Sequence, residues 1–186
     1  MKKDYLLWFF LAALIAGAAM VRVGSHFPNA TPVAAVALLA GAGLKTRWAA
    51  AVPLIAMAVS DVFIGFSPWP ITVAVYGSFA LIALLGRWLE NNRAAGRVVA
   101  AALASSILFY LITNGAVWWF SGLYAHTVDG LILCYYLAIP FFRNTMLGDL
   151  AYTGGLFLVV EYVPTLANLF HNFHNKIKIH YGTLVG

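Results

Sequence analysis

The chain alternates between long apolar runs and short polar stretches. A run of about 20 apolar residues is long enough to cross a bilayer as a helix. The first run follows Lys2 and Lys3 and also resembles a secretory signal, but its length favours a retained span. The pattern predicts six membrane-spanning helices, at residues 5–22, 32–44, 47–65, 70–88, 97–119 and 144–163.

Two apolar segments are shorter than a full span. The helix at 32–44 follows Phe27-Pro28-Asn29-Ala30-Thr31-Pro32, a turn-forming stretch with two prolines. The run Leu131–Phe142 contains Pro140 near its end and is too short to cross a bilayer. We expect it to form a re-entrant or interfacial helix that lies over the bundle.

Composition excludes a water-soluble domain. Hydrophobic residues make up 63% of the chain, charged residues 9%, and the mean hydropathy is +0.87. The 186 residues leave no room for a second soluble domain. The net charge of +5 sits beside hydrophobic segments, where cations orient helices, so nucleic acid is not an expected partner. The sequence predicts an all-α membrane protein that contacts lipid.

The distribution of lysine and arginine predicts the topology. With the N-terminus in the cytoplasm, nine of the eleven basic residues lie on the inner side and only Arg22 and Arg143 lie outside. Treating Leu131–Phe142 as a full span would leave eight against three. We therefore expect six spans within residues 1–164, with both termini cytoplasmic.

After Pro164 the chain changes character. Apolar residues at helical spacing stand beside lysines and histidines, which predicts an amphipathic cytoplasmic tail at 165–186. His171 and His174 have no evident third ligand, so no metal site is expected there.

Six polar residues interrupt the apolar runs. An ionisable side chain within a span costs on the order of 2.5–3.5 kcal/mol, so such residues are kept where they pair, meet water or hold a ligand. On the expected topology all six converge on the outer half of the bundle, with the two arginines balancing the two aspartates. The alternative is that the charged pairs only pin helices together. The six residues are Arg22, Asp61, Asn114, Arg143, Asn144 and Asp149.

Aromatic residues gather near the same expected face. They predict either the wall of a cavity for a medium-sized, partly flat organic ligand or a lipid-anchoring belt. With the six polar residues, Asn29 and Tyr136 complete the candidate ligand site. The aromatic residues are Phe27, Phe66, Trp69, Trp118, Trp119, Phe120, Tyr124, Tyr135 and Tyr136.

Small residues four apart let membrane helices approach closely. Ala12 and Ala16 have this spacing in the first predicted helix. Facing the bundle, they would serve ordinary packing; facing outward, they would form a docking surface for another membrane subunit.

No enzyme signature appears in the sequence. It lacks a phosphate-binding Gly-rich loop followed by Lys and Ser/Thr, a His-Glu-x-x-His motif and a Gly-x-Ser-x-Gly motif. The single cysteine, Cys134, is expected to be a small core residue. We predict that the protein is not an enzyme and has no catalytic or metal-binding residues.

Three segments carry a resemblance to known proteins. Residues 27–35 (FPNATPVAA), 60–66 (SDVFIGF) and 138–149 (AIPFFRNTMLGD) resemble an uncharacterised family of bacterial multi-pass membrane proteins, over about residues 20–160. That family is similar to the substrate-binding S components of energy-coupling-factor (ECF) vitamin transporters. The resemblance implies a bacterial inner-membrane protein.

Further expectations follow from the likeness to S components. It implies a ligand site near the outer face, closed by the loops after the first, third and fifth helices. It also implies that Ala12 and Ala16 meet a coupling subunit that works with ATPases. The implied ligand is vitamin-like, with cobalamin as one candidate. The leading hypothesis is a small-molecule binding and uptake protein. The alternative is a structural or assembly subunit of a larger membrane complex.

Overall fold

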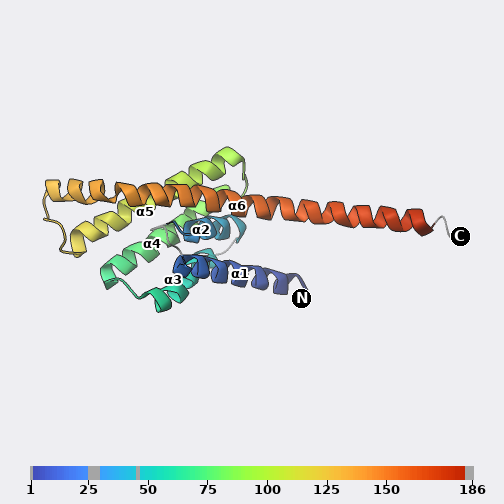
Figure 1. Cartoon of the computed structure of the whole chain (residues 1–186), viewed down its shortest axis with the longest axis horizontal. Helices are drawn as coiled ribbons and strands as arrows, with labels where there is room; N and C mark the ends of the chain where they lie inside the picture. The colour runs from blue at the N-terminus through green and yellow to red at the C-terminus, as the bar shows by residue number, and fades with distance from the viewer. Residues whose placement is uncertain (1, 25–29, 45–46, 183–186) are drawn as a thin grey trace.

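The structure is a computed structural model that describes residues 2–24, 30–44 and 47–182, with side chains described for 8–24, 30–44 and 48–162. This part of the chain is helical and contains no strand, which confirms the all-α prediction (Figure 1). The elements are α1 (Lys2–Gly24), α2 (Val33–Gly43), η1 (Arg47–Ala50), α3 (Ala51–Ile64), α4 (Trp69–Gly86), η2 (Arg87–Leu89), α5 (Ala95–Phe120) and α6 (Val128–Gly182).

Three of these helical segments are long and apolar enough to cross a membrane. They are Trp69–Leu89, Ala95–Phe120 and Val128–Tyr162. The other apolar helices are shorter, at Trp8–Gly24, Val33–Gly43 and Trp48–Ile64. The described chain therefore has the helices of a membrane protein, with three candidate spans.

The chain after Val128 forms one helix. The prediction of a separate helix at Leu131–Phe142, followed by a new span from residue 144, is wrong. A continuous helix pairs its backbone groups internally, whereas a break would leave them unpaired in lipid. Membrane helices tolerate proline because neighbouring helices and side chains satisfy the backbone groups that proline leaves free. Continuity places Arg143 within the helix, about 22 Å along its axis from Val128. The backbone of α6 is also helical across residue 164, where the tail was predicted to begin.

Helix α2 lies at the centre of the bundle. Residues from Val33 to Ala42 are all buried, and α2 packs against α4 and α6. Glycine permits the close crossing with α4, because a Cβ on Gly41 would overlap Ala83 O and a Cβ on Gly86 would overlap Leu38 O. The apolar sequence of α2 thus reflects burial against protein.

The buried C-terminal end of α2 has a charged partner. Arg93 Nη2 donates a hydrogen bond of 2.8 Å to Ala42 O. A cation near the last carbonyls of a helix satisfies an acceptor and interacts favourably with the helix dipole. This contact holds α2 to the connection between α4 and α5.

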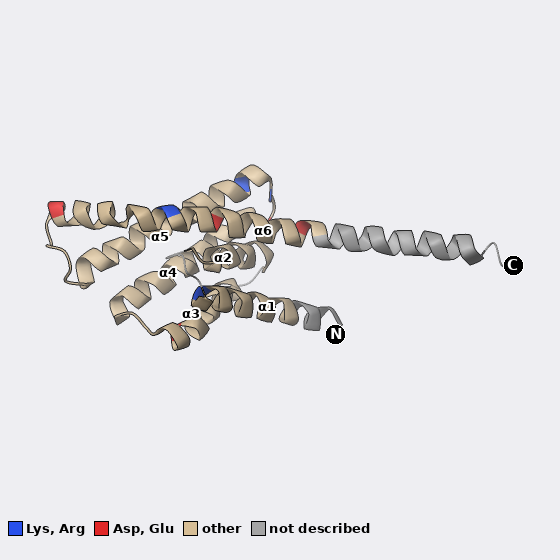
Figure 2. Cartoon of the chain, in the orientation of Figure 1, with Lys and Arg blue, Asp and Glu red and all other residues tan. Residues whose placement is uncertain are grey.

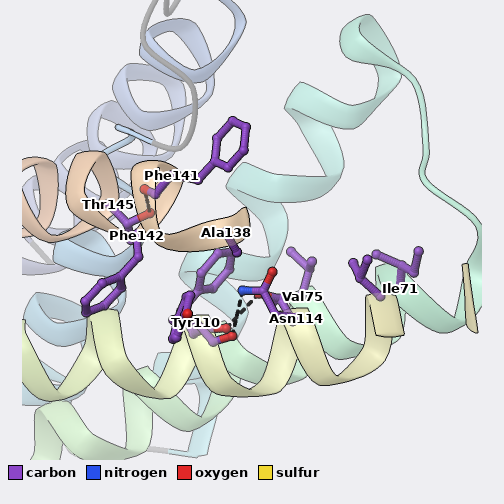
Figure 3. A pocket seen from close by; sticks show the side chains of 11 residues that line it. Ile71, Val75, Tyr110, Asn114, Ala138, Phe141, Phe142 and Thr145 are labelled. Atoms are coloured by element: carbon purple, nitrogen blue, oxygen red, sulfur yellow. Dashed lines mark hydrogen bonds between the residues drawn. The ribbon is translucent and has the colours of Figure 1, made fainter. Parts of the chain in front are cut away.

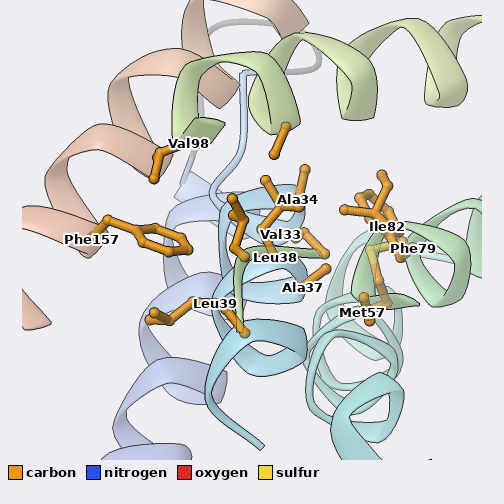
Figure 4. Close-up of a cluster of buried hydrophobic side chains, with 14 residues drawn as sticks. Val33, Ala34, Ala37, Leu38, Leu39, Met57, Phe79, Ile82, Val98 and Phe157 are labelled. Atoms are coloured by element: carbon orange, nitrogen blue, oxygen red, sulfur yellow. The ribbon is translucent and has the colours of Figure 1, made fainter. Parts of the chain in front are cut away.

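The main hydrophobic core surrounds α2. Figure 4 shows side chains of α2 among residues from α3, α4, α5 and α6. Leu38, Met57 and Ile82 are almost fully buried there. Outside this core, α1 packs mainly on α3. Two further features lie around this core. One is a cavity between α4, α5 and α6, and the other is a polar cluster between α1, α3 and α4.

Candidate ligand-binding site

A cavity of about 200 Å³ lies between α4, α5 and α6 (Figure 3). Its lining residues follow helical spacing on each wall, so one face of each helix contributes. The residues are Ile71 and Val75 from α4, Phe109, Tyr110, Thr113, Asn114 and Val117 from α5, and Ala138, Phe141, Phe142 and Thr145 from α6.

The aromatic wall of the cavity is fixed in place. The Tyr110 ring lies 4.6 Å from the Phe142 ring and 5.3 Å from the Tyr135 ring, measured between centroids. Tyr110 Oη donates to Tyr135 O at 2.6 Å, and Tyr135 Oη donates to Leu111 O at 2.6 Å. These contacts cross between α5 and α6, so they hold the ring of Tyr110 at the cavity surface.

The polar groups of the cavity are mainly acceptors. Thr113 Oγ1 donates to Phe109 O at 2.7 Å, and Thr145 Oγ1 donates to Phe141 O at 3.0 Å. Each hydroxyl has one proton, so each oxygen retains acceptor capacity. Asn114 Nδ2 donates to Tyr110 O at 2.8 Å, which leaves Oδ1 and one N–H for a ligand. The cavity therefore suits a small, flat molecule that carries hydrogen-bond donors.

The first of the two aspartates within apolar helices is paired with an arginine. Arg22 Nη1 lies 2.5 Å from Asp61 Oδ1 and donates a hydrogen bond to it, as predicted from charge balance. The same nitrogen donates to Ser60 Oγ at 2.5 Å, and Tyr76 Oη donates to Asp61 Oδ2 at 2.8 Å. We call Arg22, Ser60, Asp61 and Tyr76 the Arg22 cluster. It joins α1, α3 and α4 and contributes no residue to the cavity.

The second aspartate lies in a different environment. Asp149 is 2% exposed, and Ser106 Oγ lies 2.7 Å from its Oδ2. Arg143 is exposed on α6 and forms no ion pair within the described residues. The expectation that the second arginine balances the second aspartate is therefore wrong. Figure 2 shows how sparse the charged residues are along the described helices.

The predicted site residues divide among several places. Asn114 lines the cavity, whereas Arg22 and Asp61 form a separate cluster and Asp149 faces Ser106. The polar residues thus do not converge on one site. Tyr136 and Arg143 are exposed, Asn144 is half-buried and outside the cavity lining, and Asn29 lies outside the described residues.

Phe27 lies outside the described residues, and the other aromatic residues singled out near the outer face do not line the cavity. Trp69, Phe66 and Trp119 are 76%, 63% and 54% exposed, which favours the lipid-anchoring interpretation. The aromatic lining comes from Phe109, Tyr110, Phe141 and Phe142 instead.

Apart from Asn114, sequence reasoning missed the lining residues although a signal was present. On α5 they recur at spacings of three and four from Tyr110 to Val117, and on α6 they recur likewise from Ala138 to Thr145. Such spacing marks one helix face. Splitting α6 at residue 143 concealed that Thr145 continues the same face.

The remaining sequence expectations concern α1, metals and Cys134. Ala12 and Ala16 are exposed on α1, on the side away from buried Ala18. The described residues contain no group of three or more potential metal ligands, and the side chains of His171 and His174 lie outside them. Cys134 is 1% exposed, with Sγ 3.5 Å from Asn114 O.

Comparison with known proteins leaves the activity open. No curated protein and no solved structure matches the chain. The sequence profile described as "Family of unknown function (DUF6580)" matches residues 2–171. The matched region contains the cavity, the Arg22 cluster and Asp149. The chain belongs to this family of unknown function, DUF6580.

Proposed function

We propose that the protein binds a small organic molecule in the cavity between α4, α5 and α6 and takes part in its uptake across a membrane. The observation that carries this proposal is the cavity, which combines aromatic walls with Asn114 and two threonine hydroxyls. Apolar pockets with a few directed polar groups are typical of small-molecule sites.

The dimensions of the cavity restrict the ligand. Its volume of about 200 Å³ lies below the roughly 300–1,000 Å³ typical of sites for drug-sized ligands. A corrin such as cobalamin is too large for it, so we favour a compact aromatic or heteroaromatic molecule. Its donors would face Asn114 Oδ1 and the hydroxyl oxygens of Thr113 and Thr145.

The uptake role extends the proposal to topology and partners. It assumes six crossings, both termini on the cytoplasmic side and a bacterial inner membrane, as the lysine and arginine distribution suggests. Support for transport is the sequence resemblance to ECF S components. A coupling subunit with ATPases would supply energy, since the sequence has no nucleotide-binding motif of its own.

The test is native mass spectrometry of protein purified in mild detergent, with optical absorbance on the same sample. We expect a retained small molecule in the wild type. In Asn114→Leu, loss of a hydrogen bond worth about 1–3 kcal/mol should lower affinity about 5- to 150-fold. Ala138→Leu should lower occupancy by filling the cavity.

The matched control is Arg143→Gln, which changes an exposed residue outside the cavity. It should retain the molecule at the wild-type level. Equal occupancy in the wild type and both cavity variants would overturn the proposal, as would loss of the molecule in the control alone.

A second candidate function is that of an assembly subunit in a larger membrane complex. Two observations favour it: Ala12 and Ala16 lie on an exposed face of α1, and Arg143 is exposed partway along an apolar helix. An uncovered arginine is costly in lipid and gains from a polar partner. In this case the wild type would purify without a ligand and with other membrane subunits.

A further inference from the structure

The two intramembrane aspartates have opposite surroundings. Asp61 accepts hydrogen bonds from Arg22 and Tyr76, so a cation and a hydroxyl stabilise its charge. Asp149 is 2% exposed, and within the described residues the hydrogen-bond partner of its carboxyl is Ser106. Among described residues it has no ion pair. An ionised carboxylate at this position would be buried without a counter-charge, an arrangement that proteins avoid by neutralising the group.

Within the described residues, the elements packed against α6 bring no counter-charge to Asp149. They are α2 and α5, and the segment that leads into α2 also meets α6, where Ala30 lies beside Gly148. Helix α2 has no titratable residue, and α5 has only Arg97 and Tyr110. Arg97 is exposed, lies over the Trp88 ring and precedes Ser106 by nine residues. The hydroxyl of Tyr110 donates a hydrogen bond to Tyr135 O. The neighbours of Asp149 on its own helix bring no cation to it either, since Tyr152 is half-buried and uncharged and Arg143 is exposed.

The contacts of Ser106 are consistent with a neutral Asp149. Ser106 Oγ lies 2.7 Å from Asp149 Oδ2 and 3.1 Å from Ala102 O. A hydroxyl has one proton and cannot donate to both oxygens. If the carboxyl carries a proton, it donates to Ser106 Oγ and Ser106 donates to Ala102 O. Each of the two short contacts of Ser106 Oγ then has one donor and one acceptor.

A further hydroxyl is available on the same helix face. Thr153 is four residues after Asp149, fully buried, and its Oγ1 has no hydrogen-bond partner in the described residues. When the carboxyl loses its proton, Ser106 turns its hydroxyl to the carboxylate, whereas Thr153 Oγ1 makes no hydrogen bond to Asp149 in this structure. The hydroxyl of Ser106 thus serves both forms of the carboxyl.

We propose that Asp149 and Ser106 form a proton-binding site inside the bundle. The carboxyl of Asp149 binds the proton and exchanges it with water as an ordinary acid. The carboxyl O–H bond breaks, the proton leaves, and the carboxylate accepts from Ser106 Oγ. This proposal concerns the proton alone and does not depend on a ligand in the cavity.

The test is infrared difference spectroscopy of the full-length protein in lipid during a pH titration, in H2O and D2O. We expect a carbonyl band of a protonated carboxyl that shifts in D2O and disappears at high pH. Asp149→Asn should abolish this band. Asp129→Asn, which alters an exposed carboxylate, should leave it unchanged.

Ser106→Ala provides a second measurement should Asp149→Asn fail to fold. It keeps the carboxyl but removes its hydrogen-bond partner, so the frequency and titration midpoint of the band should both shift. Absence of a titrating band in the wild type, its persistence in Asp149→Asn, or an unchanged band in Ser106→Ala would overturn the proposal.

Discussion

At the residue scale, the protein treats its buried polar groups in different ways. The carboxylate of Asp61 is held by Arg22 and Tyr76. Asn114 bonds to its own helix and keeps one face for the cavity. Asp149 has Ser106 as the hydrogen-bond partner of its carboxyl among the described residues. Burial alone therefore does not define the role of a polar residue here. The groups that contact it, mostly from a neighbouring helix, do.

The first prediction concerns the ion pair between Arg22 and Asp61. Asp61→Asn should lower the free energy of unfolding by about 3–5 kcal/mol, because it leaves a partly buried guanidinium without its counter-charge. The double substitution Arg22→Met with Asp61→Leu should recover much of that loss, since no unpaired charge remains. The measurement is denaturation in mixed micelles followed by tryptophan fluorescence.

Tyr76→Phe is the control for this experiment. It removes one hydrogen bond to the carboxylate and keeps the charge pair, so a smaller loss of about 1.5–3 kcal/mol is expected. If the double variant were less stable than Asp61→Asn, the pair would have another role than charge compensation.

At the element scale, close helix contacts decide the architecture. Gly41 and Gly86 let α2 and α4 meet backbone to backbone, and α6 continues where the sequence predicted a break. These two features bring the cavity walls together. The first positions α4 against the central helix, and the second carries Ala138 and Thr145 on one face of α6.

The second prediction tests the crossing of α2 and α4. Gly86→Ala would place a methyl group against the Leu38 backbone, so we expect a loss of about 1–3 kcal/mol from overpacking. Gly77→Ala, in the same helix with open space around the new methyl group, should be neutral or stabilising by up to about 1 kcal/mol. Thermal unfolding measures both; equal behaviour would argue against a tight crossing.

The third prediction tests the continuity of α6. Spin labels at exposed Leu133 and Tyr162, in a Cys134→Ser background, span 29 positions. A continuous helix separates their backbones by about 44 Å at 1.5 Å per residue. Pulsed electron resonance should give a single distribution near this distance, broadened by the labels. A distribution centred at a much shorter distance between the labels would support the predicted re-entrant helix instead.

At the scale of the whole molecule, two surfaces have no partner among the residues that the structure describes. One is the face of α1 with Ala12 and Ala16, and the other is the face of α6 with Arg143 and Tyr136. Either lipid or another membrane protein covers them. An outward row of small residues allows a second helix to approach closely, which connects this face to both proposed functions.

The fourth prediction follows from the outward position of Ala12 and Ala16. Leucine at both positions should leave thermal stability unchanged, because the new side chains point away from the bundle. If α1 docks another membrane subunit, as the proposed functions hold, the same variant should lose the subunits that copurify with the wild type. Ala18→Leu, at a position 2% exposed, should instead destabilise the protein by about 1–3 kcal/mol. Retention of every partner by the outward variant would exclude this face as the docking surface.

The sequence by itself determined the helical class, the membrane character and the polar residues worth examining. It did so because apolar run length and the cost of charge in lipid are properties of the chain alone. It also predicted that an arginine and an aspartate would pair, as Arg22 and Asp61 do.

Only the tertiary structure decided which face each polar residue occupies and which helices meet. Arg143 and Asp149 are six residues apart on one helix, yet one is exposed and the other buried. The cavity is built from residues of α4, α5 and α6 that are distant in sequence. Helix rotation and crossing depend on packing between segments, and that information does not reside in any one apolar run.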